Sequence, residues 1–260
     1  ETMNRRDRRQ AERNAKKSNN EKSHELPIHL IQPWAVPIIH SKLPPEILQT
    51  MIEISDDVIA DKNSISHGGY LAGQIDTELR VPHEKLNEVG AMNFFLDLCN
   101  HFVKVVKGQQ YPYDAEKIQA EKLFIQMLTM WIVSQKPNEY NPIHIHTECQ
   151  ISCVMYLKIP KFESSKKTHR SQDDGSITFV SNSPKDPEFG ATSISIRPML
   201  GDIFIFSAHQ QHLVYPYRCS EGDPERRSVS FNAVFETETS RKSRLAGESK
   251  HPMENPIKVM

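Results

Sequence analysis

The stretch Asn141-Pro142-Ile143-His144-Ile145-His146-Thr147-Glu148 opens a run that continues to Pro160. Successive side chains of an extended strand point to opposite faces. If the whole run is extended, His144 and His146 therefore lie on one face. That face continues through Glu148, Gln150, Ser152, Val154 and Tyr156. The sequence thus predicts a strand that presents two imidazoles side by side.

A third imidazole can come from a segment much later in the chain. Gly201-Asp202-Ile203-Phe204-Ile205-Phe206 is typical of a turn followed by a buried strand, and His209 and His212 come after it. Two histidines close in sequence and one distant, brought together by two strands, are a usual source of a three-ligand metal site. We favour His212 as the third ligand and keep His209, on the loop entering the strand, as the fallback.

Another alternating strand is predicted at Arg226-Arg227-Ser228-Val229-Ser230-Phe231-Asn232. Alternation places Arg226, Ser228, Ser230 and Asn232 on one face. Arg227 falls on the other face, and we expect it to point outward. Taken alone, Arg226 is also compatible with a surface ion pair to Glu225 or Asp223.

The second half of the chain contains short segments rich in β-branched and aromatic residues, separated by turn formers. They are 123–133, 151–159, 177–180, 193–196, 203–206 and 229–235. Helical spacing is found earlier, after Pro44-Pro45 up to Ile59 and from Pro82 to Val106. We predict an α+β fold in which N-terminal helices flank a double-stranded β-helix of the jelly-roll or cupin-like kind.

The composition divides the chain into one domain with extensions. Residues 1–25 are rich in Arg and Lys and poor in apolar side chains, so they are predicted to be a disordered basic arm. Residues 26–237 are predicted to form a single domain, with helical support at 44–106 and a jelly-roll core at 120–237. Residues 238–260 are predicted to be a polar tail.

Four connecting regions are interpreted from local composition. Residues 28–39 are apolar but interrupted by prolines, as in strands at a sheet edge. Residues 68–73 form a glycine-rich connection, which is either a plain loop or a cover for the site. The polar loops at 161–172 and 181–189 could carry substrate-selecting surface.

Length, charge and cysteine content limit the classes of protein and of partner that the chain can belong to or bind. The chain has 260 residues and 37% apolar content, enough for one sizeable core. A net charge of −1 gives no field that would attract nucleic acid, although the basic arm leaves that open. No run reaches the ~18 apolar residues of a membrane helix, so we expect a soluble, cytoplasmic protein. Cys99, Cys149, Cys153 and Cys219 form no C-x-x-C pair and are predicted to be free thiols.

In order, the motifs NPIHIH, ISCVMYL, GDIFIFSAHQQHLV and ERRSVSFN resemble the iron(II)- and 2-oxoglutarate-dependent oxygenases. Within that superfamily they are most similar to a bacterial and phage group of 2-oxoglutarate-iron(II) oxygenases related to prolyl hydroxylases. The resemblance covers roughly residues 120–236, less than half of the chain. Cys153 stands where that group usually has glycine, and Thr147 stands where proline is common.

The resemblance implies iron(II), 2-oxoglutarate as cosubstrate, and O2. Two ligand sets remain open. In the first, His144, His146 and His212 bind the metal, with His146 where the superfamily has its carboxylate. In the second, His146, Glu148 and His212 form the two-His-one-carboxylate set usual for non-haem iron(II). We favour the first, because His-x-His is what the resembling group shows. Either histidine alone would more simply be an exposed or hydrogen-bonded strand residue.

A dicarboxylic cosubstrate leaves its far carboxylate inside the barrel, where an unpaired charge is costly. Arg226 can bind that carboxylate through two hydrogen bonds while staying ionised, and Ser228 adds a hydroxyl donor on the same face. The remaining candidate cosubstrate contacts are Tyr156, Asn232, Ser152 and Trp131. Each of them could equally be ordinary core packing.

The implied reaction is hydroxylation of an unactivated C–H bond. The kinship with prolyl hydroxylases suggests a prolyl or other side chain in a peptide or protein as the target. One alternative is a three-histidine dioxygenase on a cupin-like barrel without a cosubstrate, which would leave Arg226 and Ser228 unexplained. Another is a non-catalytic jelly-roll binding or virion-associated protein. The oligomeric state cannot be predicted from this sequence.

Overall fold

The computed structural model describes residues 37–163, 173–181, 192–220 and 222–247. All of them belong to one compact unit, Ala35–Met260. The predicted basic arm, most of the 28–39 run, the greater part of both polar loops and the end of the predicted tail lie outside the described residues. Among the described helices, none has the length and apolar character needed to cross a membrane.

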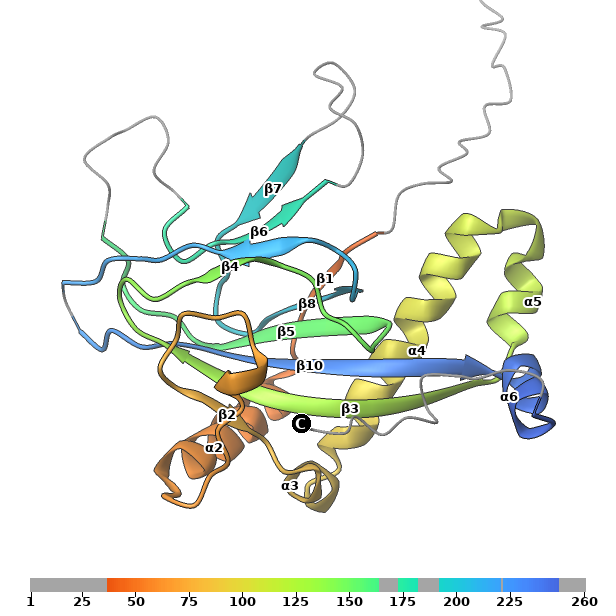
Figure 1. Ribbon diagram of the computed structural model, residues 1–260, viewed down its shortest axis with the longest axis horizontal. Coiled ribbons are helices and arrows are strands. Elements are labelled where there is room, and N and C mark those ends of the chain that lie inside the picture. The colour runs from red at the N-terminus through yellow and green to blue at the C-terminus, as the bar shows by residue number, and fades with distance from the viewer. Residues whose placement is uncertain (1–36, 164–172, 182–191, 221, 248–260) are drawn as a thin grey trace, which may run out of the picture. The chain divides into compact units, whose positions relative to one another are not determined.

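Two antiparallel sheets form the core, which confirms the predicted α+β jelly-roll fold (Figure 1). The larger sheet has the order β1 (Ile39–Lys42), β8 (Asp202–Ser207), β5 (Ile151–Lys158), β10 (Arg226–Thr237), β3 (Leu123–Gln135) and β2 (Glu78–Arg80). The smaller sheet has the order β4 (Asn141–His144), β9 (His212–Val214), β6 (Ile177–Val180) and β7 (Ser193–Ile196). In Figure 1 the smaller sheet lies above β5, β10 and β3.

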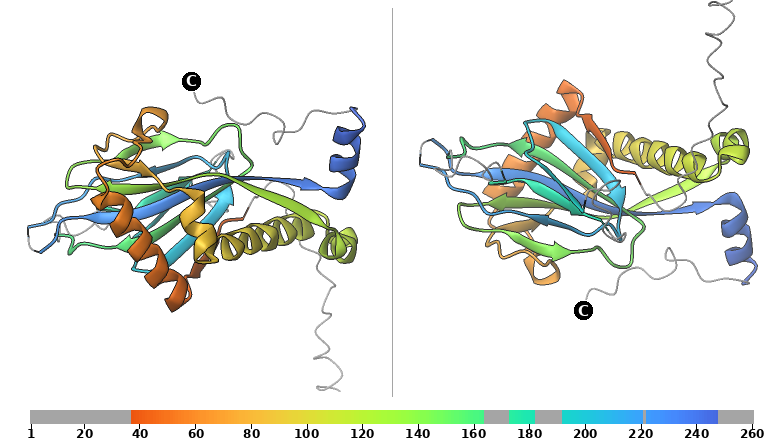
Figure 2. Two further views of the ribbon diagram at one scale, coloured as in Figure 1. Left: turned by 90° about the horizontal axis from the view of Figure 1, so that it is seen from below. Right: turned by 90° about the horizontal axis from the view of Figure 1, so that it is seen from above.

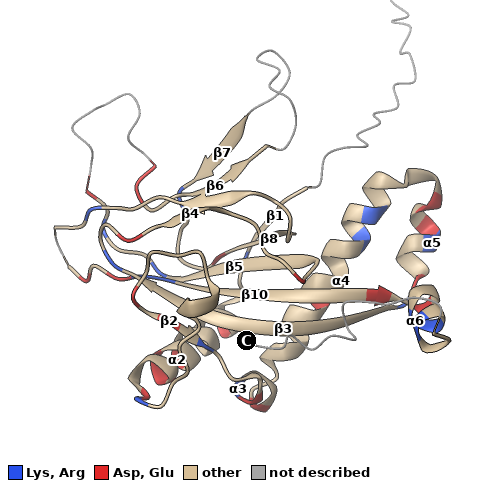
Figure 3. Ribbon diagram, in the orientation of Figure 1, with Lys and Arg blue, Asp and Glu red and all other residues tan. Residues whose placement is uncertain are grey.

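Helices cover the other face of the larger sheet. They are α2 (Pro45–Ala60), α3 (His83–Glu88), α4 (Ala91–Gln110) and α5 (Ala115–Ala120), with α6 (Glu238–Leu245) following β10. Figure 2 shows α2 and α4 beneath this sheet. Charges of both signs occur along these helices (Figure 3), in keeping with the near-zero net charge.

Strand alternation decides which side chains meet the helices. Phe231 on β10 pairs with Met130 and Cys153 on the neighbouring strands, and all three are fully buried. They belong to one apolar cluster with Met51 of α2 and Phe95 of α4. This layer holds the larger sheet rigid, because burying such side chains contributes ~1.5–3 kcal/mol each. The opposite face of the same strands is thereby turned toward the smaller sheet.

Several predicted boundaries need correction. The helix predicted from Pro82 to Val106 is two helices, because Gly90 adopts a left-handed φ of 73° between α3 and α4. The run predicted as one strand from Asn141 is also interrupted, because β4 ends at His144 and Glu148 has a φ of 58°. Of the run 28–39, predicted as an edge of the sheet, residues 28–36 lie outside the described residues, and its end enters the edge strand Ile39–Lys42.

The predicted polar tail begins with a helix. Thr237 caps α6 through its side-chain oxygen, which accepts a hydrogen bond from the backbone N–H of Ser240. In return, the Ser240 hydroxyl oxygen accepts a hydrogen bond from the backbone N–H of Thr237. Arg244 then pairs with the buried Glu236 at 2.8 Å. Residues 238–245 are therefore ordered against the end of β10.

Candidate metal and cosubstrate site

The inner face of the larger sheet carries a row of polar side chains along β10. Arg226, Ser228, Ser230 and Asn232 alternate on this face. Their partners on the two neighbouring strands are Gln135, Val133, Trp131 and Thr129 on β3, and Tyr156, Val154 and Ser152 on β5. This face borders a cavity of about 670 Å³ between the two sheets. The predicted face of β10 therefore lies inside the barrel, as alternation required.

Three histidines meet at the other wall of this cavity. His144 on β4 and His212 on β9 are cross-strand partners, and His146 lies two residues beyond the first. One ligand atom from each lies within 4.8 Å of the others. The Nε2 atoms of His146 and His212 are 3.4 Å apart, and the rings of His144 and His212 are 4.2 Å apart. These atoms could hold one metal ion between them.

Backbone hydrogen bonds fix the orientation of two of these rings. His144 Nδ1 lies 2.7 Å from the carbonyl oxygen of Pro142, and His212 Nδ1 lies 2.8 Å from that of Gln210. A carbonyl can only accept, so each Nδ1 carries the proton and each Nε2 keeps its lone pair. The lone pairs are thus directed toward the shared space in which a metal would bind.

Burial keeps these imidazoles neutral. Burial and the neighbouring His144 lower the pKa of His146 to about 4 and that of His212 to about 3. Burial also lowers the pKa of His144. A neutral imidazole is the form that binds a transition metal. The donor set is therefore suited to iron(II), although it contains three nitrogens instead of two nitrogens and a carboxylate.

Aromatic side chains surround the histidines. The ring of Trp131 lies 5.8 Å from that of His146, and the ring of Phe206 lies 4.9 Å from that of His212. Both are almost fully buried. An apolar wall of this kind limits the access of water to a metal and strengthens the electrostatic interactions at the site.

Two side chains considered as ligands lie outside this cluster. Glu148 is exposed, and its positive φ breaks the strand parity on which its candidacy rested. His209 is exposed on the turn after β8. In the part of the chain that the structure describes, the group able to hold a metal consists of His144, His146 and His212.

Arg226 lies fully buried at the far end of the cavity, 1% exposed. Its Nε donates to the carbonyl oxygen of Gly175 at 3.1 Å, and its Nη1 donates to Gln135 Oε1 at 3.0 Å. Nη2 has no hydrogen-bond partner among the described residues. The interaction partners are all neutral, so the guanidinium charge is uncompensated within the described protein.

Tyr156 is the close neighbour of this guanidinium. The Arg226 Cζ atom lies 4.8 Å from the centre of the Tyr156 ring. Burial raises the pKa of Tyr156 to about 12 against the opposing charge of Arg226, so its hydroxyl stays protonated. Tyr156 Oη, like Arg226 Nη2, has no partner among the described residues. Two neighbouring buried donors therefore lack partners among the described residues, a feature that favours an anionic ligand.

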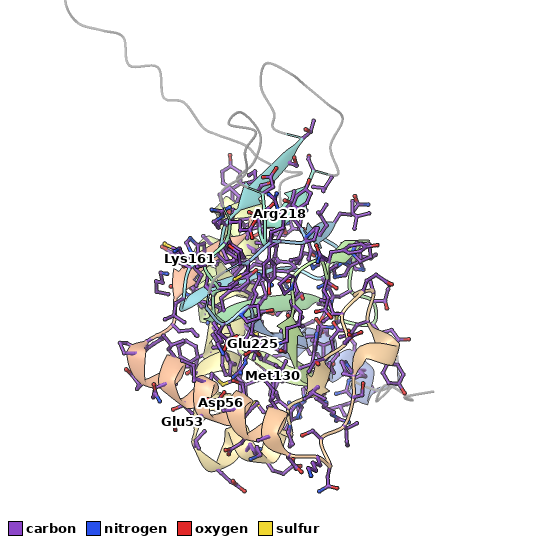
Figure 4. The ribbon with its side chains drawn as sticks, turned by 90° about the vertical axis from the view of Figure 1, so that its left-hand side faces the viewer. Glu53, Asp56, Met130, Lys161, Arg218 and Glu225 are labelled. Atoms are coloured by element: carbon purple, nitrogen blue, oxygen red, sulfur yellow. The ribbon has the colours of Figure 1, made fainter. Side chains whose placement is uncertain are left out.

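The expectation that Arg227 points outward was wrong. Arg227 is 6% exposed and lies between β10 and α2. Its Nε and Nη2 donate to the two oxygens of Glu225, each at 2.9 Å, and its Nη1 contacts Ser55 and Asp56 (Figure 4, where Asp56 and Glu225 are labelled). Parity placed Arg227 on the correct face, but a helix and not solvent covers that face. The predicted surface ion pair with Glu225 is made by Arg227, not by Arg226.

Sequence reasoning missed His67 and Glu78 on one wall of the cavity. The segment before β2, with the short 3-10 turn η1 (Gly68–Tyr70), contributes His67, Tyr70 and Leu71, and β2 itself contributes Glu78. The three residues of β2 are too few to show an alternating pattern. The glycine-rich connection 68–73, for which the sequence left open a plain loop or a cover for the site, therefore borders the cavity.

Comparisons with known proteins agree with the motifs. Residues 129–232 match the model of the family described as "Putative 2OG-Fe(II) oxygenase". No curated protein matches the chain. The matched span begins at Thr129 and ends at Asn232, so it contains all three histidines and Arg226.

Similar folds occur among solved structures at low identity. A 2OG-Fe(II) oxygenase family oxidoreductase from Burkholderia pseudomallei has 15% identity and a TM-score of 0.32, and the matched parts cover 48% of this chain and half (50%) of that one. A Pseudomonas putida prolyl-4-hydroxylase has 12% identity and a TM-score of 0.44, and the matched parts cover 76% of this chain and 93% of that one. A Trichoplax adhaerens prolyl hydroxylase, solved with a peptide fragment, has 11% identity and a TM-score of 0.46. The matched parts cover 96% of this chain and 99% of that one.

The motif order and the family match point to the same class, the non-haem iron oxygenases. The match of residues 129–232 to the model of the 2OG-Fe(II) oxygenases agrees with the resemblance drawn from the sequence. A match to this family indicates an enzyme that uses iron(II), 2-oxoglutarate and O2. The three-histidine cluster is the group of described residues that fits the metal.

Proposed function

We propose that this chain is a 2-oxoglutarate-dependent hydroxylase whose oxygenase domain spans residues 26–237. One observation carries the proposal. A single cavity holds three convergent neutral imidazoles at one wall and, at its far end, a buried guanidinium with an unpartnered Nη2. A metal would satisfy the first group, and a carboxylate would satisfy the second.

The residue roles follow from this arrangement. His144, His146 and His212 hold iron(II) through Nε2. Arg226 binds the far carboxylate of 2-oxoglutarate, and Ser228 lies one step along the same inner face. Arg226 and Ser230 are four residues apart, ~13 Å in an extended strand, and Ser230 pairs with the Trp131 that packs on His146. The cavity therefore has the length to place a small diacid between the two groups.

Two further residues bind or orient these groups. Tyr156 keeps its hydroxyl proton and donates a hydrogen bond to the cosubstrate carboxylate. Asn232 lies beside His146, where its side chain partly offsets the lowering of the histidine pKa by burial. Asn232 also lines the cavity, where its side chain can contact a bound molecule. These roles are predictions from contact and burial.

When bound, the metal, 2-oxoglutarate and O2 would supply the oxidising chemistry: one oxygen atom of O2 enters succinate as 2-oxoglutarate loses carbon dioxide, and the other enters the hydroxylated C–H bond. The protein holds the groups and excludes water. Trp131 and Phe206 form the apolar wall, and the carbonyls of Pro142 and Gln210 hold the histidine rings in place. Fixed geometry of this kind lowers the barrier by limiting reorganisation.

The proposed substrate is a side chain of a peptide or protein, with a prolyl residue as one member of that class. The cavity opens between exposed apolar side chains of the segment before β2 and of the segment after β4. They are Ile65, Tyr70 and Ile145, which are 65%, 55% and 41% exposed and line the cavity. Exposed apolar side chains at a cavity entrance provide contact area for a polypeptide.

An anaerobic titration tests the proposal. Iron(II) and 2-oxoglutarate together should develop the visible charge-transfer band of a chelated cosubstrate, and neither should do so alone. Iron binding without any response to 2-oxoglutarate would favour the three-histidine dioxygenase. Failure to bind either component would favour a non-catalytic jelly-roll protein.

A further inference from the structure

A buried carboxyl group that the proposed chemistry does not use lies at the open edge of the larger sheet. Glu78 is on β2 and pairs with Val133 of β3, so its side chain shares the inner face. It is 2% exposed and lines the same cavity as the histidines. Its Oε2 atom has no hydrogen-bond partner within the described residues. Buried carboxyl oxygens in that state are rare and call for an explanation.

Two glycines keep the space around this carboxyl group open. A Cβ atom at Gly73 would lie 2.9 Å from Glu78 Oε1 and 2.5 Å from Asn141 Oδ1. A Cβ atom at Gly68 would lie 3.3 Å from Glu78 Oε2. Any larger residue at Gly73 would therefore press on Glu78. The close approach of these segments places the carboxyl group at a fixed position beside the cavity.

The charges around Glu78 favour a cation. Among the described residues Glu78 makes no ion pair. Arg80, two positions along the same strand, is exposed and also lines the cavity, and burial together with its charge lowers the pKa of His67. Burial, and then the negative charge of Glu139, raise the pKa of Glu78 to about 7. A cation beside this carboxyl group would stabilise its ionised form. It would offset both the cost of burying the negative charge and the repulsion by Glu139.

An aromatic row runs beside Glu78 from the histidine cluster to the cavity entrance. The ring of Trp131 lies 5.4 Å from that of His67, which lies 5.6 Å from that of Tyr70. The backbone N–H of His67 donates to the carbonyl oxygen of Glu78 at 2.8 Å, so the row and the carboxyl group are held together. Aromatic faces attract ammonium and guanidinium groups, most strongly when desolvated.

We propose that Glu78, Trp131 and His67 form a subsite for a cationic group of the substrate, an ammonium or a guanidinium. The substrate class is then a molecule with a basic side chain, in the target residue or next to it. This assignment of the substrate rests on the proposed oxygenase function, whereas binding of a cation at the subsite does not. Glu78 and His67 lie outside the segment that matches the oxygenase family model.

Tryptophan fluorescence can report on this subsite directly. The chain has two tryptophans, Trp34 and Trp131, so a Trp34→Phe variant of the full chain leaves Trp131 as the reporter. The probes are n-butylammonium and n-butylguanidinium, with n-butanol as the neutral match. The proposal predicts a saturable change in Trp131 emission with the cations, at an affinity at least about tenfold above that for n-butanol. That ratio corresponds to about 1.4 kcal/mol.

Substitution of Glu78 then tests the role of the carboxylate. Glu78→Gln should weaken binding of both cations about tenfold or more and leave n-butanol unchanged. Glu53→Gln, at an exposed position on α2, is the matched control and should change nothing. If Glu78→Gln fails to fold, Glu78→Asp keeps the charge and should keep the preference for cations over n-butanol.

The outcomes separate this inference from the proposed function. Equal affinity for n-butylammonium and n-butanol, no saturable signal with either cation, or unchanged cation binding in Glu78→Gln would each overturn the inference. The anaerobic 2-oxoglutarate band would still form in those cases if the proposed function is correct. Conversely, a selective cation site in a chain without that band would preserve the subsite and overturn the oxygenase proposal.

Discussion

The two faces of the larger sheet treat polar groups in opposite ways. On the outer face, Arg227 is buried but all its nitrogens are paired, with Glu225, Asp56 and Ser55. On the inner face, buried polar atoms lack partners among the described residues. They are Glu78 Oε2, Thr129 Oγ1, Ser152 Oγ, Tyr156 Oη, Arg226 Nη2 and Asn232 Oδ1. Since leaving such an atom unpaired costs ~1–3 kcal/mol, the inner face is built to receive ligands and the outer face is built for stability.

The largest expected effect is loss of the metal. His212→Ala removes the most buried of the three imidazoles, so we expect iron(II) affinity to fall by more than about 100-fold, beyond the range seen when only an outer-shell contact is lost. His209→Ala, three positions earlier and exposed, is the control and should bind normally. Isothermal titration under anaerobic conditions measures both. Full iron occupancy in His212→Ala would remove this histidine from the site.

Arg226→Ala should affect the cosubstrate and spare the metal. Loss of a buried, charge-paired partner typically costs 2–5 kcal/mol, so we expect 2-oxoglutarate affinity to fall by about 30-fold or more. Iron(II) affinity in the absence of 2-oxoglutarate should stay within about twofold of the wild type. Unchanged 2-oxoglutarate affinity would mean that the far carboxylate binds elsewhere in the cavity.

Arg227→Ala should lower the stability of the fold and leave 2-oxoglutarate binding unchanged. It leaves Glu225 buried beside α2 without its main partner, so we expect unfolding free energy to fall by about 3–5 kcal/mol in urea denaturation. The folded fraction should keep its affinity for 2-oxoglutarate. A stable Arg227→Ala protein that cannot bind 2-oxoglutarate would show that the two faces have been assigned the wrong way round.

The same ion pair predicts a smaller acid effect. Burial alone would raise the pKa of Glu225, but hydrogen bonds from Arg227, Ser134 and Lys158 outweigh it and hold the pKa at about 2. Because the folded pKa lies below the ordinary value of 4.5, this stabilisation is complete above pH 4.5 and is lost as the pH falls toward 2. Urea midpoints measured between pH 5 and pH 3 should therefore fall less in Glu225→Gln than in the wild type. Equal slopes would contradict the shifted pKa.

Much of this contrast could be predicted from the sequence, because alternation is a property of the strands themselves. Alternation alone placed Arg226, Ser228 and Asn232 on one face. The choice of His144, His146 and His212 over a set with Glu148 also needed the resemblance to the oxygenase family. What covers a face is not encoded in alternation. Arg227 was therefore assigned to solvent, although α2 lies over it.

Single-residue backbone changes account for other errors. Gly90 ends one helix and begins another through one left-handed φ, and Glu148 ends the strand pattern in the same way. Glycine gives some warning of such a turn, but glutamate gives none. Glu78 was missed because its strand is only three residues long and becomes part of the site through pairing with a distant strand.

An anaerobic crystal structure with iron(II) and 2-oxoglutarate tests the central claim most directly. We expect a metal bonded to Nε2 of His144, His146 and His212, and a 2-oxoglutarate carboxylate within hydrogen-bonding distance of Arg226 Nη2. A metal bound by other side chains, or a cosubstrate carboxylate that does not contact Arg226, would contradict it.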